Sequence, residues 1–153
     1  MESQRWLDDT EQRAWRAYLD ATRLLMAALD RQLTRDAGIS LTDFELLVNL
    51  SEAPDRRMRM SALADAVVTT RSGATRAIAR LVDAGWVRRV ECPDDKRGTL
   101  AELTDDGATK LADTSPGHVD AVRSSMFDLL SEEDVVRIGE SFGAMRKHLL
   151  GNG

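Results

Sequence analysis

The chain opens with a long stretch of helical periodicity. Between about residues 10 and 36, apolar side chains recur at steps of three and four, which puts them on one face of a helix. These positions are Trp15, Tyr18, Leu19, Leu25, Met26, Leu29 and Leu33. Gly38 is expected to end this helix in a left-handed cap. A terminal helix of this length packs against its own chain or against another subunit, and periodicity alone favours neither.

A second helix is predicted after a short break. Thr42 and Glu45 have the spacing of a capping box, which predicts a helix that begins there and stops before Pro54. A polar loop follows this helix. Residues 58–60 can then form a very short strand against a later hairpin.

A pair of helices joined by a turn occupies the middle of the chain. Ser61 is a good N-cap for the first helix and Thr70 for the second, and Gly85 should end the second. The second helix divides into two faces. Its buried stripe is expected to be Ala74, Ala77, Ile78 and Leu81, and its outer face to be Arg71, Ser72, Thr75, Arg76 and Arg80.

Two β-prone segments follow the helix pair. Residues 86–91 and 99–103 are predicted strands, and the polar, basic segment 93–98 is their connection. A helix-turn-helix followed by a β-hairpin is the arrangement of a winged helix. This arrangement is typical of proteins that bind DNA.

The remainder of the chain returns to helical periodicity. Thr104-Asp-Asp-Gly107 predicts a helix start, and Pro116-Gly117 predicts that this helix kinks or restarts. Ser131 is an N-cap for a last helix. The residues that this helix is expected to bury are Val135, Ile138, Phe142, Met145 and Leu149.

Charge is distributed unevenly along the chain. The 153 residues carry a formal net charge of −5, which by itself argues against nucleic acid. The segment from Arg56 to Arg97, however, holds ten basic and five acidic residues and therefore carries a net +5. A basic module on an acidic scaffold suits DNA binding, because the local field attracts phosphates. Chance clustering on a solvated face is the alternative.

The outer face of the second helix is predicted to contact DNA. In a helix-turn-helix, the N-terminal part of this helix enters the major groove. Arg76 is the first choice for a base contact, because a guanidinium can bridge O6 and N7 of guanine; a phosphate contact is equally open. Thr70 and Ser72 are expected to bond phosphates beside the helix N-terminus. The other predicted contacts on this helix are Arg71, Thr75 and Arg80.

The basic hairpin predicts a second DNA contact. Arg97 fits insertion into a narrow minor groove, where negative potential is concentrated. Lys96 is a candidate for a phosphate. Asp95 cannot favour DNA directly, so it is expected to orient Arg97 or another arginine through a charge-assisted bond.

Four further arginines flank these segments. Arg56 and Arg57 could touch the DNA backbone from the loop before the helix pair, and a solvated loop is the alternative. Arg88 and Arg89 are neighbours on a strand, where side chains alternate between faces. At most one of these two is therefore expected to point toward DNA.

Several other classes of protein are not indicated. With one cysteine, Cys92, the chain can form no intrachain disulfide, which fits a reducing cytoplasm. No apolar run approaches the about 18 residues of a membrane span, and the N-terminus lacks a signal-peptide core, so a soluble cytoplasmic protein is expected. His118 and His148 are too few and too scattered for a metal site, and no cofactor is expected. No catalytic motif indicates an enzyme.

These segments together resemble the MarR (multiple antibiotic resistance regulator) family of winged-helix transcription factors. The helix of residues 70–87 looks like the recognition helix, Pro93-Asp-Asp-Lys-Arg-Gly98 like the Asp-x-Arg wing, and Leu103-Thr-Asp-Asp-Gly107 like the wing exit. Gly73 and Ala74 are smaller than the residues often found there, which leaves the operator sequence open. The resemblance implies a homodimer with intertwined first, fifth and sixth helices and two winged lobes that bind a pseudo-palindromic operator in double-stranded DNA.

The expected fold is therefore mainly α with a small β-wing. A winged helix-turn-helix in residues 37–104 is embedded between dimerisation helices in residues 1–36 and 105–153. The expected function is a dimeric, sequence-specific transcriptional regulator, most simply a repressor. A winged-helix module that binds protein, and a redox-responsive regulator acting through Cys92, are the alternatives.

The resemblance also implies a small-molecule effector. The family often responds to phenolic or aromatic carboxylate compounds near the junction of the dimerisation helices and the winged lobe. Trp15, Tyr18 and Arg23 could supply such a pocket. His118, beside the Pro116-Gly117 break, could line one, although a surface position is the simpler interpretation for this histidine.

Overall fold

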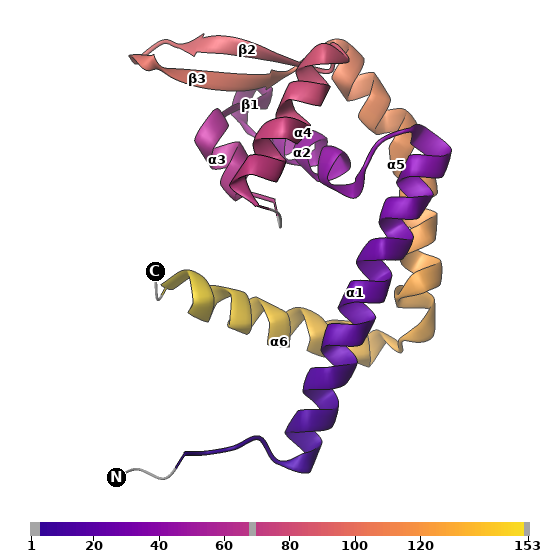
Figure 1. The fold of residues 1–153 in the computed structure, drawn as a ribbon. Coiled ribbons are helices and arrows are strands. Elements are labelled where there is room, and N and C mark those ends of the chain that lie inside the picture. Colours follow the sequence, from indigo (N-terminus) through magenta and orange to yellow (C-terminus); the bar gives the residue numbers. More distant parts are fainter. Residues whose placement is uncertain (1–3, 68–69, 152–153) are drawn as a thin grey trace. The chain divides into compact units, whose positions relative to one another are not determined.

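The computed structural model describes residues 4–67 and 70–151 (Figure 1). Contacts within the chain divide it into two compact units, with the division between His118 and Val119. The first unit holds helix α1, the winged lobe and most of helix α5, and the second holds the rest of α5 and helix α6. Each unit is described by itself.

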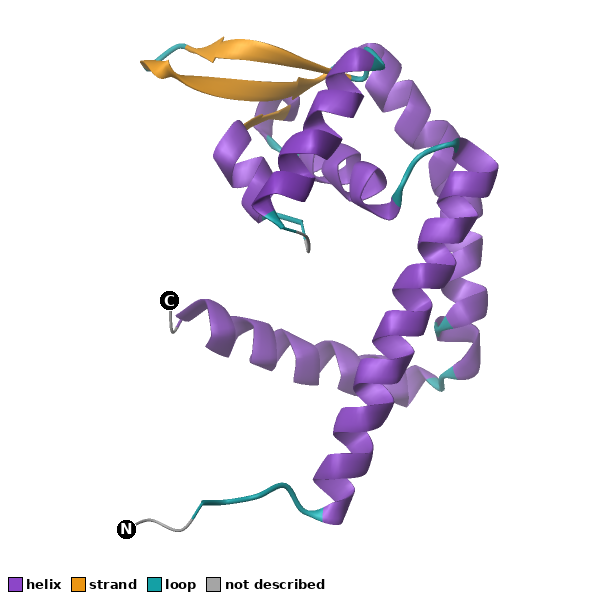
Figure 2. Ribbon diagram, viewed as in Figure 1, coloured by secondary structure: helices purple, strands orange, loops and turns teal. Residues whose placement is uncertain are grey.

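The winged lobe combines three helices with a three-stranded antiparallel sheet (Figure 2). Its helices are α2 (Leu41–Glu52), α3 (Met60–Asp65) and α4 (Arg71–Asp83), with a 3-10 turn at Pro54–Arg56. Its strands are β1 (Arg57–Arg59), β2 (Val87–Cys92) and β3 (Asp95–Leu103), in the order β1-β3-β2. The predicted helix-turn-helix, β-wing and short first strand are confirmed.

The core of the lobe lies between its helices and one face of the sheet. Each helix contributes fully buried side chains, and the sheet closes the core from the other side. The stripe predicted for α4 is confirmed, because all four of its residues are at most 1% exposed. The largest buried side chains are Leu46, Leu47, Leu50, Leu63, Ile78, Leu81 and Val87.

Among the N-caps of the winged lobe, one agrees with the sequence and two differ. Thr70 caps α4 as predicted. Ser61 does not cap α3, because the helix begins at Met60 and has no side-chain cap. The predicted box of Thr42 and Glu45 is also wrong. Helix α2 instead begins with a capping box of Ser40 and Asp43, whose side chains and backbone N–H groups exchange two hydrogen bonds of 3.0 Å.

The wing hairpin is longer than predicted. Strand β3 begins at Asp95 rather than at Thr99, so that only Pro93 and Asp94 lie between the strands. A bulge between Glu91 and Cys92 pairs Cys92 with Asp95. Asp95, Lys96 and Arg97, which the sequence places in the connection, therefore lie on strand β3. Exposed positions of a hairpin accept polar side chains on both faces, so their polarity did not exclude a strand.

Two long helices belong wholly or mostly to the first unit. Helix α1 (Asp9–Ala37) ends at Gly38, whose φ of 68° confirms the predicted left-handed cap. Helix α5 (Asp105–Ser125) runs through Pro116 without the predicted restart. The hydroxyls of Thr114 and Ser115 donate to the carbonyls of Lys110 and Leu111, each at 2.7 Å, in the turn before the proline.

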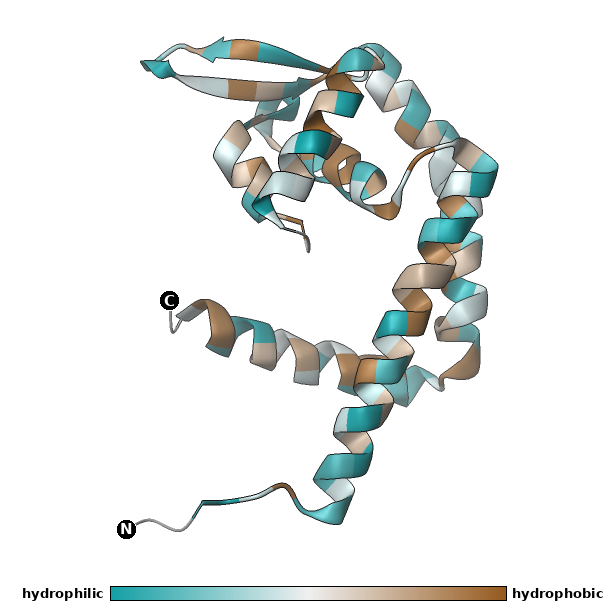
Figure 3. Ribbon diagram, viewed as in Figure 1, coloured by the Kyte–Doolittle hydropathy of each residue, from teal (hydrophilic) through white to brown (hydrophobic). Residues whose placement is uncertain are grey.

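The second unit consists of the end of α5, a 3-10 turn at Phe127–Leu129 and helix α6 (Glu132–Gly151). Ser131 Oγ accepts the N–H of Asp134 at 3.1 Å, so the predicted cap is confirmed. The predicted burial is wrong, because no described residue of α6 is buried. Figure 3 shows apolar bands that recur along this ribbon. An apolar stripe indicates which face of a helix can be covered, but not whether its own chain covers it.

The Leu-Thr-x-x-Gly motif joins the end of α4 to the start of α5. Thr104 Oγ1 donates to the carbonyl of Gly85 at 2.7 Å and accepts the N–H of Gly107 at 3.0 Å. A Cβ atom on Gly107 would lie 2.1 Å from the carbonyl oxygen of Trp86 and 2.7 Å from Cδ1 of Leu103. Only glycine therefore allows α5 to start this close to β2.

We predict that Gly107→Ala destabilises the protein by about 1–3 kcal/mol, the usual cost of overpacking. The backbone of Trp86 cannot yield as the end of a flexible side chain can. Gly117→Ala, on the same helix, would meet only Nε2 of Gln32 at 3.8 Å and should be neutral or stabilising by up to about 1 kcal/mol. Urea unfolding followed by circular dichroism compares the two variants. Equal stability of Gly107→Ala and wild type would contradict the tight contact.

A buried carboxylate joins the three strands of the sheet. Glu102 of β3 lies opposite Arg57 of β1 and Arg88 of β2 and forms an ion pair with each. Its side chain is only 8% exposed. The hydrogen bond from Arg57, with a smaller contribution from Arg88, holds the pKa of the Glu102 carboxyl below its ordinary value, although burial opposes this shift. One side chain therefore anchors the wing to the lobe.

We predict that Glu102→Gln lowers the free energy of unfolding by about 1–3 kcal/mol at pH 7, because two arginines lose a charged acceptor. A depressed folded-state pKa contributes stability above the unfolded value of about 4.3 and loses it as the pH falls through the folded value. The difference between wild type and variant should therefore close below about pH 4. The midpoints of urea unfolding between pH 3 and pH 8 measure this difference in stability. Glu91→Gln, at an exposed position on the same hairpin, is the control, and a difference independent of pH would contradict the role of the carboxylate.

Candidate nucleic-acid interface

The outer face of α4 presents the predicted DNA-contacting side chains to solvent. Thr70 Oγ1 accepts the N–H of Gly73 at 3.1 Å and lies 3.3 Å from Oγ of Ser72. Two hydroxyls therefore stand at the positive end of the helix dipole, where an anion is favoured. The exposed residues along this face are Arg71, Ser72, Thr75, Arg76 and Arg80.

Ion pairs divide the ten basic residues between Arg56 and Arg97 into two groups. Six form ion pairs with carboxylates: Arg56 with Asp105, Arg57 and Arg88 with Glu102, Arg59 with Asp95, Arg71 with Asp65, and Arg80 with Asp43. Within residues 4–67 and 70–151, the other four have no side-chain hydrogen bond or ion pair; they are Arg76, Arg89, Lys96 and Arg97. A cation without a carboxylate partner gives up only water when it meets a phosphate.

The six ion pairs differ in strength. Arg80 lies 2.8 Å from the carboxylate of Asp43, which is 10% exposed and also belongs to the capping box of α2. This pair ties α4 to α2. Arg71 lies 3.1 Å from Asp65, and both side chains are largely exposed, so the pair contributes at most about 1 kcal/mol. Arg71 can exchange its partner for a phosphate at little cost, whereas Arg80 cannot.

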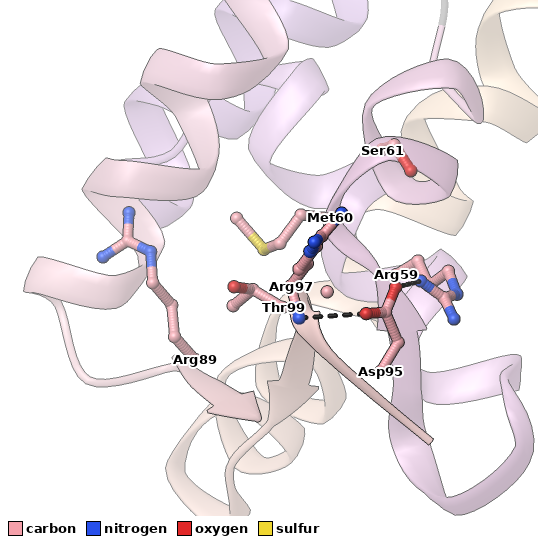
Figure 4. A pocket seen from close by; sticks show the side chains of 8 residues that line it. Arg59, Met60, Ser61, Arg89, Asp95, Arg97 and Thr99 are labelled. Carbon is pink, nitrogen blue, oxygen red and sulfur yellow. Dashed lines mark hydrogen bonds and ion pairs between the residues drawn. The ribbon is translucent and has the colours of Figure 1, made fainter. Parts of the chain in front are cut away.

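A basic hollow of about 480 Å³ lies between the wing hairpin, β1 and the start of α3 (Figure 4). Asp95 Oδ1 accepts the backbone N–H of Arg97 at 3.0 Å, and Oδ2 lies 3.8 Å from Nη1 of Arg59. The ion pair with Arg59 fits the predicted role of orienting another arginine, whereas the contact with Arg97 is through its backbone N–H. The residues that line the hollow are Arg59, Met60, Ser61, Arg89, Asp95, Arg97, Gly98 and Thr99.

Four polar residues of this hollow were not predicted as site residues. Arg59, Ser61, Arg89 and Thr99 come from four separate elements, β1, α3, β2 and β3, and the pairing of β1 and β2 with β3 brings them together. The alternation of Arg88 and Arg89 was the one usable signal in the sequence. It showed that one of the two could face DNA without showing which.

The predicted ligand residues divide between different places on the first unit. His118 is half-buried, with its ring centroid 4.4 Å from that of Phe44 and Nδ1 3.3 Å from Oε1 of Gln32, so a surface position is wrong for it. Trp15 lies beside Tyr18, with ring centroids 6.0 Å apart. Arg23 lies 3.8 Å from the carboxylate of Asp20.

His118 lines a small, mainly apolar hollow of about 240 Å³ between α1, α2 and α5. Burial raises the pKa of Glu45 and lowers the pKa of His118, so both groups are shifted toward their neutral forms. Trp15 lines a different hollow, of about 360 Å³, near the start of α1. The residues of the His118 hollow are Met26, Leu29, Leu41, Phe44, Glu45, Val48, Asn49 and His118.

The thiol of Cys92 is buried beside the turn of the wing hairpin, which shields it from oxidants and gives the redox alternative no structural support. No group of three or more potential metal ligands occurs in the part of the chain that the structure describes. Among the same residues, no helix is long and apolar enough to cross a membrane.

Comparison with known proteins identifies this architecture. The sequence model described as the MarR family matches residues 37–98. A MarR family transcriptional regulator from Streptomyces coelicolor, solved in complex with DNA, is 48% identical, has a TM-score of 0.89, and covers 97% of this chain and 93% of its own.

Two curated regulators are also similar. The HTH-type transcriptional regulator PecS of Dickeya dadantii is 29% identical over 131 residues, which is 84% of this chain and 77% of PecS. The HTH-type transcriptional repressor YetL of Bacillus subtilis is 31% identical over 96 residues, 63% of this chain and 58% of YetL. All of these relatives are regulators of transcription and none is an enzyme. The chain belongs to the MarR family of winged-helix transcriptional regulators.

Proposed function

We propose that this regulator is a homodimeric, sequence-specific repressor that binds a pseudo-palindromic operator. The observation that carries the proposal is the set of unpaired cations on the outer face of α4 and on the wing. A dimer presents two such surfaces, which reach successive major grooves about 34–36 Å apart. The DNA-bound relative from Streptomyces coelicolor and the repressor YetL support this assignment.

Exposed apolar side chains support the homodimer. On α1, Trp15 and Leu24 are 52% and 57% exposed, and on α6, Met145 and Leu149 are 48% and 67% exposed. Large uncovered apolar faces mark interaction sites in soluble proteins. A second copy of the chain can cover both faces in a symmetric arrangement. Residues 1–36 and 105–153 then serve dimerisation, and residues 37–104 serve DNA binding.

In this proposal the exposed end of α4 lies in the major groove. Arg76 contacts a base, most simply guanine, since its guanidinium is free to form two parallel hydrogen bonds. The hydroxyls of Thr70 and Ser72 bind the phosphates that flank this groove. Thr75 and Arg71 extend the same contact surface along the helix.

The wing contributes a second set of contacts. Arg97 enters the minor groove, Lys96 binds a phosphate, and Asp95 maintains the shape of the turn between them. Arg56 stays available because its ion pair with Asp105 is exposed. The other two predicted contacts, Arg57 and Arg80, act mainly by holding the sheet and α4 in place.

We predict that Arg76→Ala weakens binding to a selected operator by about 1–3 kcal/mol, roughly 10- to 150-fold, and relaxes preference at one base position. Arg80→Ala, one turn further along α4, should lower stability more than affinity, because it breaks the ion pair with Asp43. The operator is first selected from genomic fragments, and fluorescence anisotropy then measures affinity across salt concentrations. Sedimentation of the complex should show two chains per operator.

Two results would overturn these proposals. If selection returns no preferred sequence and salt has little effect on binding, the chain does not act by binding DNA. If sedimentation shows one chain per operator, the homodimer is wrong.

The hollow beside His118 supports release by a small effector. It lies between α1 and α5, which serve dimerisation in this proposal, and α2 of the winged lobe. A ligand that favours one spacing of these helices changes the fit of the lobes to successive grooves. Because no lysine or arginine lines this hollow, it suits an uncharged aromatic ring or phenol better than an aromatic carboxylate.

We predict that phenols release operator DNA at lower concentrations than aromatic carboxylates of the same size. His118→Ala should weaken this response and leave affinity for DNA unchanged, because the histidine lies outside the proposed DNA contacts. Trp15→Ala, in the other hollow, is the matched control. Fluorescence anisotropy of the labelled operator measures the affinity for DNA and its loss when the compound is added, for each variant. A response that is lost in Trp15→Ala but kept in His118→Ala would place the effector in the hollow lined by Trp15. If none of the phenols or aromatic carboxylates releases the operator, the proposed release by an effector is wrong.

A further inference from the structure

We propose that the hollow between the wing hairpin and the start of α3 binds a phosphate of the DNA backbone, with Arg89 as its principal cation; this inference rests on the proposed function. The sequence predicted that at most one of Arg88 and Arg89 points toward DNA, without showing which. The proposal depends on three features of the wing. These are the face on which Arg89 lies, the absence of a carboxylate partner for it, and the groups that surround it.

The register of the sheet separates Arg88 from Arg89. Arg88 lies opposite Glu102 and Arg89 lies opposite Ala101, so the two side chains leave opposite faces of the hairpin. Arg88 forms an ion pair with the buried Glu102. Arg89 lies on the face that lines the hollow. The structure therefore assigns one arginine to the sheet and leaves the other for a ligand.

Arg89 has no carboxylate to satisfy it. Asp95, the acidic residue among those that line the hollow, is already engaged by Arg59 and by the backbone of Arg97. Glu91 is the next residue on the same face, but it does not line the hollow and forms no ion pair within the described residues. Three guanidinium groups therefore face one carboxylate, which leaves a net charge of +2 at the hollow.

The remaining groups fit a phosphate. Figure 4 shows Arg89 and Arg59 on opposite sides of the hollow, with Arg97 between them and Ser61 on the adjacent helix. The hydroxyls of Ser61 and Thr99 can donate to phosphate oxygens while the guanidinium groups form charge-assisted bonds. A Cβ atom on Gly98 would lie 2.8 Å from Nη1 of Arg59, so glycine at this position lets Arg59 lie against the hairpin.

The position of the hollow favours DNA as the source of the phosphate. It lies between the wing, whose Arg97 is proposed to enter the minor groove, and the start of α3 in the helix-turn-helix. A phosphate on the strand that borders this groove is the group within reach. A free phosphate has the same chemistry, and the experiment must therefore distinguish the two sources.

The test compares Arg89→Ala with Arg88→Ala in the full-length protein. Binding to the selected operator and to a random duplex is measured by anisotropy at several salt concentrations. Arg89→Ala should weaken binding to both duplexes by the same factor, about tenfold, and make the slope of log K against log salt shallower by about 0.9, the contribution of one phosphate. Arg88→Ala should lower the melting temperature and leave the slope unchanged. Arg89→Lys should restore the slope, because it restores the charge.

Each contrary result has a separate meaning. If wild type binds DNA with a steep salt dependence and Arg89→Ala keeps that slope, the phosphate site is wrong and the proposed function survives. If the wild-type protein shows no salt-dependent binding to DNA, the phosphate site and the proposed function are both wrong. If Arg89→Ala loses affinity for the operator but not for the random duplex, Arg89 contacts a base and not a phosphate. If inorganic phosphate titrated by NMR shifts the side-chain signal of Arg89 in the free protein while Arg89→Ala leaves the DNA slope unchanged, the hollow binds a free phosphate.

Discussion

The position of the wing depends on the buried carboxylate of Glu102. It stands at the middle of a three-stranded sheet and pairs with one arginine on each neighbouring strand. Removing one member of such a group leaves a buried charge without compensation, which costs more than the intact pairs contribute. Strand β1 is only three residues long, and its ion pair between Arg57 and Glu102 adds to its backbone pairing with β3 and to the packing of Met58 against the core. The wing therefore stays in register with the helix-turn-helix because one acid accepts hydrogen bonds from both sides.

The same principle explains how a chain with a net charge of −5 can present a surface that binds DNA. Acidic residues in and around the winged lobe are paired with specific arginines, and each pair removes one cation from the binding surface. Glu102 retains two arginines for the sheet, and Asp43 retains Arg80 for the contact between α4 and α2. The cations that remain lie on α4 and on the wing. The potential at a groove depends on these local charges, since salt screens the acidic remainder of the chain over about 8–10 Å.

Much of the fold could be predicted from the sequence because it follows from local chemistry. Thr70 and Gly85 delimit α4 through a cap hydrogen bond and a left-handed residue, and the spacing of Ala74, Ala77, Ile78 and Leu81 places its buried face. The misplaced cap of α2 had a competitor, because Ser40 and Thr42 are both good cap residues. The choice between them depends on Asp43, whose carboxylate also meets an arginine 37 positions away. Contacts at that separation leave no trace in local periodicity. Burial of α6 failed for a related reason, since periodicity defines a face and says nothing of what lies against it.

The candidate site was predictable only as far as it lies on a single element. The outer face of α4 follows from helical spacing, whereas the hollow of the wing combines residues from β1, α3 and both strands of the hairpin. Its composition is decided by register. A shift of one residue between β2 and β3 would exchange the faces of Arg88 and Arg89, moving a cation from the hollow to the far side and leaving Glu102 opposite the wrong neighbour. The pairing of Glu102 with Arg57 and Arg88 opposes that shift at one end of the hairpin. The bulge at Glu91 and Cys92, with Asp95 bound to the backbone of Arg97, opposes it at the other. The residues that hold the register therefore need not touch DNA to determine which arginine does.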